Sequence, residues 1–128
     1  MWYAAHIIQY ARFLDGAQDV YPCYENVVLI QADSSDHARQ EAARIGQAAY
    51  GPTGGGFTWG GRPAEWVFAG IRKVIQCDNT DVTQPAGQEP GFTPGHGTEV
   101  TYSTLEVDSI EALDKLVAGA AVAVRYEE

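Results

Sequence analysis

Residues 25–36 read ENVVLIQADSSD, a compact apolar run that ends in a cluster of small polar residues. The run contains no Gly or Pro and is rich in Val, Leu and Ile, which predicts a buried β-strand over residues 25–32. Asp33 can accept hydrogen bonds from the free N–H groups of a helix start, and Asp36 suits the positive end of the helix dipole. We therefore expect a helix over residues 34–49, with Asp33 as its N-cap.

The same pattern recurs near the end of the chain. Residues 98–107 (TEVTYSTLEV) alternate as a strand with a polar face, and residues 108–111 (DSIE) match residues 33–36 (DSSD). A second helix should follow with Asp108 as its cap and Gly119 just past its end. Because the rest of the two halves does not align, a common capping preference explains the repeat better than a duplication does.

Both helices are expected to carry one apolar stripe. The inward residues of the first helix are Ala38, Ala42, Ile45 and Ala49. The inward residues of the second helix are Ile110, Leu113, Leu116 and Val117. A stripe composed mostly of alanine has little side-chain bulk, so the first helix can lie close against a sheet.

Three further strands complete the predicted fold. Residues 2–13 (WYAAHIIQYARF) are apolar on both faces, and residues 65–76 (EWVFAGIRKVIQ) form a second long run. Asp15-Gly16 favours a reversal, after which residues 18–22 run back briefly until Pro22 interrupts the ladder. Residues 120–126 close the chain as the last strand.

The element order is therefore β-β-α-β-β-α-β, which predicts an α+β fold. We expect a mixed or antiparallel sheet of about five strands, with two helices on one face and a ferredoxin-like character. A length of 128 residues fits one domain over residues 1–128, with a flexible loop at residues 78–97. That loop holds three prolines and four glycines, and a loop of this length is often functional or disordered.

The charge balance narrows the choice of partner. Acidic residues outnumber basic residues 17 to 8, giving a net charge of −9, which disfavours nucleic acid and anionic membranes. A basic protein or a cationic ligand would suit this surface, and solubility alone also explains it. The start of the chain lacks a signal-peptide pattern, and no run approaches the roughly 20 apolar residues of a membrane span. We expect a cytoplasmic protein.

No pattern for catalysis, metal or cofactor binding is present. The glycine-rich residues 51–61 lack the lysine of a phosphate loop and lead into a strand, so a hairpin-like turn is the better interpretation. Cys23 and Cys77 lack a CxxC neighbour and are expected to be free, buried or half-buried thiols. We expect no cofactor and no metal, and whether the chain is an enzyme stays open, with a non-catalytic role favoured.

Four residues remain as binding candidates. Phe57, Trp59 and Trp66 lie close together around a turn and a strand start, and they either join the core or anchor an interface. His96 lies in the 78–97 loop and is the histidine with a site role. By contrast, His6 is expected to be a satisfied strand residue and His37 a surface residue of the first helical turn.

Four strings carry a family resemblance: WYAAH (2–6), ENVVL (25–29), WVFAGIRK (66–73) and GTEVTYS (97–103). Together they resemble a family of small bacterial proteins of unknown function, over nearly the whole chain. The resemblance implies a bacterial, free-standing cytoplasmic protein, and it implies no activity, cofactor or catalytic residue.

Two functions remain open. The first is a non-catalytic interaction or adaptor protein, of immunity type or similar, that forms a homodimer and binds another protein or a small ligand. The alternative is a small enzyme or ligand-binding protein with a pocket under the 78–97 loop, in which His96 and a nearby acid act as an acid–base pair.

Overall fold

The computed structural model describes residues 1–50, 56–77 and 94–127. Within these ranges the chain forms six strands and two helices, which confirms the α+β class. In chain order the elements are β1 (Trp2–Phe13), β2 (Tyr21–Gln31), α1 (Ser35–Tyr50), β3 (Phe57–Trp59), β4 (Arg62–Gln76), β5 (Glu99–Val107), α2 (Ile110–Ala118) and β6 (Arg125–Glu127).

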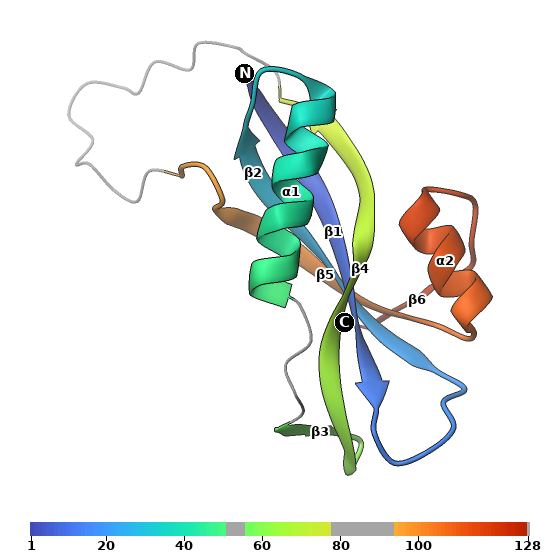
Figure 1. The fold of residues 1–128 in the computed structure, drawn as a ribbon. Coiled ribbons are helices and arrows are strands. Elements are labelled where there is room, and N and C mark those ends of the chain that lie inside the picture. Colours follow the sequence, from blue (N-terminus) through green and yellow to red (C-terminus); the bar gives the residue numbers. More distant parts are fainter. Residues whose placement is uncertain (51–55, 78–93, 128) are drawn as a thin grey trace, which may run out of the picture.

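The strands form one curled sheet in the order β3-β4-β1-β2-β5-β6 (Figure 1). Every neighbouring pair is antiparallel. A ferredoxin-like sheet is built from split βαβ units, whose strands run parallel, so the strand order differs from that expectation. β1 lies in the interior of the sheet and pairs with β2 and β4 along most of its length.

The two helices cover opposite faces of this sheet, and the expectation of one shared face was wrong. Ile7 and Ile8 are consecutive in β1 and both fully buried, yet Ile7 packs in the cluster of Ala38 from α1 and Ile8 in that of Leu113 from α2. Successive side chains of a strand point to opposite faces. Because β1 is apolar on both faces, each face needs a cover.

Helix α1 approaches the sheet closely, as its alanine stripe predicted. Ala38 and Ala42 are fully buried, whereas Ala49 is exposed and does not belong to the inward stripe. Gly46 takes that place instead. A Cβ on Gly46 would lie 2.6 Å from Cε2 of Phe68, so the glycine makes room for a β4 ring.

Helix α2 rests on a glycine of β4. Gly70 has a φ of 155°, and a Cβ there would overlap Cγ1 of Val117. The Arg72 guanidinium also donates a hydrogen bond to the carbonyl oxygen of Leu116. The β1–β4 register shifts between Ile8 and the next residue, and such a bulge re-aims the strand locally.

The helix caps lie one residue later than expected. The Ser34 hydroxyl accepts a hydrogen bond from the backbone N–H of His37 at 3.1 Å. The Ser109 hydroxyl accepts one from the N–H of Ala112 at 3.0 Å. A side-chain acceptor three residues before its donor is the N-cap arrangement, so the assignment of Asp33 as cap was wrong.

Asp108 likewise has another role. Its carboxylate accepts a hydrogen bond from the Arg125 guanidinium of β6 at 2.6 Å, which holds the pKa of Asp108 below its usual range. Arg125 also pairs with Glu106 at 3.2 Å. The far end of α2 follows expectation, because Gly119 is left-handed (φ 76°) and its N–H bonds to the last turn.

Strand limits differ from prediction at both ends of the chain. Pro22 lies within β2 and does not interrupt it, because pairing with β1 ends at Cys23 and only β5 still flanks the proline. β6 begins at Arg125, and residues 120–124 are not a strand. Val122 and Val124 instead pack against the α2 cluster as coil.

The predicted glycine turn is a β-hairpin. β3 pairs with the start of β4, and Gly60 and Gly61 both have positive φ (58° and 80°), which suits a tight two-residue hairpin loop. β4 therefore begins at Arg62 and not at residue 65. Residues 51–55 of the glycine-rich stretch and residues 78–93 of the predicted loop lie outside the described residues.

Candidate functional site

Five aromatic rings form a continuous chain on the face of the sheet that carries α1. Trp66 lies at its centre, with ring centroids 5.3 Å from Phe57, 5.9 Å from Trp59 and 4.9 Å from Tyr24. Tyr102 extends the chain, 5.7 Å from Tyr24. We call these five residues the aromatic surface. The three predicted aromatics are therefore in mutual contact through Trp66.

Strand register places these rings together. Phe57 pairs with Ala64, and Trp66 lies two residues beyond Ala64, so both rings share one face. Opposite Trp66 on β1 is Ala11, whose small side chain is fully buried. β3 and the first part of β4, which carry Phe57, Trp59 and Trp66, lie beyond the C-terminal end of α1 (Figure 1).

The five rings are neither buried in the hydrophobic core nor all fully exposed to solvent. Tyr102 is 61% exposed, and the other four are half-buried. The sequence left open whether Phe57, Trp59 and Trp66 belong to the core or to an interface. Half-buried rings that contact one another on a part of the sheet that neither described helix covers have the character of an interface, since Trp and Tyr are enriched there.

A chain of polar side chains adjoins the aromatic surface. The Gln9 side-chain N–H donates to Oδ1 of Asn26 at 3.0 Å, and the Asn26 side-chain N–H donates to the Glu99 carboxylate. Gln9 and Asn26 are buried, whereas Glu99 is exposed. With Tyr24 and Tyr102 these residues line a cavity of about 210 Å³.

The charge in this cavity is negative. Among the residues that the structure describes, Glu99 has no basic partner, and its hydrogen bond comes from a neutral amide. In contrast, all six arginines donate to acceptors elsewhere: Arg12, Arg39, Arg44, Arg62, Arg72 and Arg125. An uncompensated carboxylate beside aromatic rings favours a cationic group.

His96 does not join the aromatic surface. Its Nδ1 accepts a hydrogen bond from the backbone N–H of Gln31 at 2.9 Å. Tyr24 lies seven residues earlier in the same strand, or about 24 Å away at about 3.4 Å per residue. The pocket proposed under the 78–97 loop depends on residues 78–93, which lie outside the described ranges.

The other titratable residues have structural partners. His6 Nδ1 and the Glu25 carboxylate lie 2.9 Å apart and both are largely buried, as expected of a satisfied strand histidine. Cys23 is a buried free thiol, and burial raises its pKa to about 12; Cys77 is free and half-buried. Over residues 1–50, 56–77 and 94–127, no group of three or more His, Cys, Asp or Glu could hold a metal ion.

Sequence reasoning missed five residues of this site: Gln9, Tyr24, Asn26, Glu99 and Tyr102. A signal for two of them was present, because Gln9 and Asn26 interrupt otherwise apolar strands and a buried amide needs a partner. No local pattern links Glu99 and Tyr102 to β1 or β4. Their position follows from the β2–β5 register, in which Asn26 pairs with Tyr102.

The chain matches the family model described as a domain of unknown function (DUF4288) over residues 2–101. The chain belongs to this family. The DUF4288 match agrees with the expectation of a family of unknown function. It spans β1 to β4 and enters β5, and it includes every residue of the site except Tyr102. The chain has no significant match among curated proteins or solved structures.

Neither helix of the described part combines the length and the apolar character that crossing a bilayer requires.

Proposed function

We propose that this DUF4288 protein is a non-catalytic binding protein of the bacterial cytoplasm that docks a basic segment of another protein on its aromatic surface. The observation that carries the proposal is the continuous chain of five rings beside the Glu99 carboxylate. The proposal combines the adaptor role, the aromatic anchor and the basic partner that the sequence suggested, and it adds Tyr24, Tyr102 and Glu99 to the surface.

The rings supply the affinity in this proposal. Phe57, Trp59 and Trp66 come from one hairpin, and the contacts of the first two rings with Trp66 limit the side-chain entropy that docking would cost. Aromatic residues at the centre of an interface commonly contribute more binding energy than their neighbours do. Among the five rings, Trp59 lies at the end that β3 contributes. It is half-buried, so a partner can cover the part that is still exposed.

The negative charge of the protein favours a basic partner. A net charge of −9 steers basic molecules toward the protein and repels acidic ones. Glu99 gives this attraction a position, at the edge of the ring chain. Two copies meeting through the same surface would bring two uncompensated Glu99 carboxylates together, so we propose a different, basic partner here. The homodimer expected from the sequence stays a prediction.

A non-catalytic role is supported by the chemistry of the cavity. Its buried polar residues, Gln9 and Asn26, are amides that neither titrate near neutral pH nor act as nucleophiles. They bond to each other and to Glu99. This series of hydrogen bonds can hold the Glu99 carboxylate in a fixed orientation, which suits the recognition of a basic partner.

Photo-crosslinking tests the proposal. p-Benzoylphenylalanine is placed at position 59 in one variant and at position 58 in another, and each is irradiated in a lysate of the source organism. Thr58 is the matched control because it lies between Phe57 and Trp59 and its side chain points to the opposite face. We expect a crosslinked protein with a basic isoelectric point from position 59 and not from position 58.

Two results would refute this proposal. Identical products from positions 58 and 59 would mean that the surface has no selectivity. A product in which the chain is crosslinked to itself would favour the homodimer instead.

The salt dependence of binding tests the role of charge. The partner that crosslinking identifies should, once purified, bind the unmodified chain more weakly as salt is raised, since screening weakens exposed charge pairs.

A further inference from the structure

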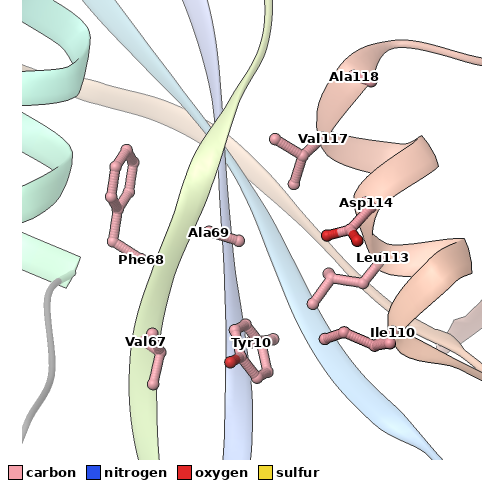
Figure 2. A pocket seen from close by; sticks show the side chains of 9 residues that line it. All are labelled: Tyr10, Val67, Phe68, Ala69, Ile110, Leu113, Asp114, Val117 and Ala118. Atoms are coloured by element: carbon pink, nitrogen blue, oxygen red, sulfur yellow. The ribbon is translucent and has the colours of Figure 1, made fainter.

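A second concave site lies on the opposite face of the sheet, between α2 and β4. Figure 2 shows Leu113 and Val117 of α2 facing Val67 and Ala69 of β4, with Tyr10 of β1 at the base. Phe68, by contrast, is directed away toward α1. The groove has a volume of about 330 Å³, at the low end of the roughly 300–1,000 Å³ typical of small-molecule sites.

The groove owes its width to how α2 is seated. At its C-terminal end the helix contacts β4 directly, because Gly70 has no side chain to hold Val117 away. At its N-terminal end Ile110 remains 42% exposed and lines the groove. The apolar stripe of α2 is therefore only partly used by the core, and the remainder faces the groove.

One charged residue lines this mostly apolar groove. Asp114 follows Leu113 in α2, and its carboxylate is directed toward the groove in Figure 2. Asp114 has no hydrogen bond or ion pair with any described residue. The Arg72 guanidinium of β4 donates to the carbonyl oxygen of Leu116. An unpaired carboxylate at an apolar wall attracts a cation whose body is apolar.

We propose that this groove binds a small organic amine, with the apolar body of the amine between α2 and β4 and its ammonium group at the Asp114 carboxylate. With roughly 30 Å³ per water, the volume equals about eleven waters. A lysine side chain, with five non-hydrogen atoms, would leave more than half of that space empty, so we assign the site to a free ligand of about ten such atoms. The site is independent of the aromatic surface, since Trp66 and Val67 lie on opposite faces of β4.

Three matched probes test the proposal by ¹⁵N-HSQC titration of the whole chain. They are 3-phenylpropylamine, the neutral 3-phenyl-1-propanol and the anionic 3-phenylpropionate. We expect the amine to bind with a Kd of about 1 mM or tighter, to shift the amides of Val67, Ala69 and Leu113, and to bind at least about tenfold more tightly than the alcohol. The propionate should not bind.

Two variants separate the site from the general charge of the protein. Asp114→Asn should weaken amine binding about tenfold and leave alcohol binding unchanged. Glu111→Gln removes the same charge from the same helix but does not line the groove, and it should leave both unchanged. Equal binding of amine and alcohol, shifts confined to other regions, no binding at all, or an equal effect of the two variants would overturn the proposal.

Discussion

The seating of α2 on β4 makes a strong prediction about Gly70. Replacing Gly70 by alanine adds a methyl group where Cγ1 of Val117 already lies, at a backbone φ of 155° that side chains rarely adopt. Overpacking typically costs about 1–3 kcal/mol, and a sparsely populated backbone conformation costs about 1–3 kcal/mol. We therefore expect Gly70→Ala to lower the free energy of unfolding by about 4 kcal/mol.

Urea denaturation measures this loss. With a slope of about 2 kcal/mol per M for a small domain, the midpoint should fall by about 2 M. Gly95→Ala is the matched control, because a Cβ on Gly95 would meet nothing within 4 Å and its backbone is not left-handed. That variant should be neutral or slightly stabilised, by up to about 1 kcal/mol.

A double-mutant cycle separates the two causes. In a Val117→Ala background the steric part should disappear, so that Gly70→Ala costs only about 2 kcal/mol and the coupling energy is about 2 kcal/mol. Strict additivity of Gly70→Ala and Val117→Ala would refute the direct contact between α2 and β4. It would also remove the structural basis of the groove.

The remaining predictions concern the two thiols and the helix caps. Iodoacetamide should label only Cys77 in the native protein and both thiols in denaturant, as read by mass spectrometry. Since burial raises the Cys23 pKa from 9.0 to about 12, the folded state retains a proton that the unfolded chain releases. The free energy of unfolding should therefore fall between pH 9 and 12, and Cys23→Ala should remove this component. Ser109→Ala should cost about 1 kcal/mol in urea denaturation, and a larger loss from Asp108→Asn would contradict the cap assignment.

The strands and helices were largely predictable because hydrophobic periodicity is local. The runs at residues 2–13 and 25–32 both became strands, and both helices begin within a residue of their predicted starts. The assignment of the helices to one face was wrong, although the signal was present. Consecutive Ile7 and Ile8 already required cover on both faces of β1.

Contacts within the site were predictable only between residues that lie close together in the sequence. Phe57, Trp59 and Trp66 lie on one hairpin, so their contact followed from sequence proximity. Tyr102 reaches them across β2, through a register that no nearby residue reveals. His96 was selected because it lies in a loop rich in glycine and proline, but its ring bonds to the backbone at the end of β2.

The docking claim is tested most directly with the partner that crosslinking identifies. This partner is purified in its free form, and its affinity for single variants of the chain is measured. Isothermal titration is carried out with Trp59→Ala and with Thr58→Ala, both shown to be folded by circular dichroism. An aromatic anchor of an interface contributes about 2 kcal/mol or more, so Trp59→Ala should weaken binding about thirtyfold and Thr58→Ala less than about twofold. Equal affinities of the two variants would contradict docking on the aromatic surface.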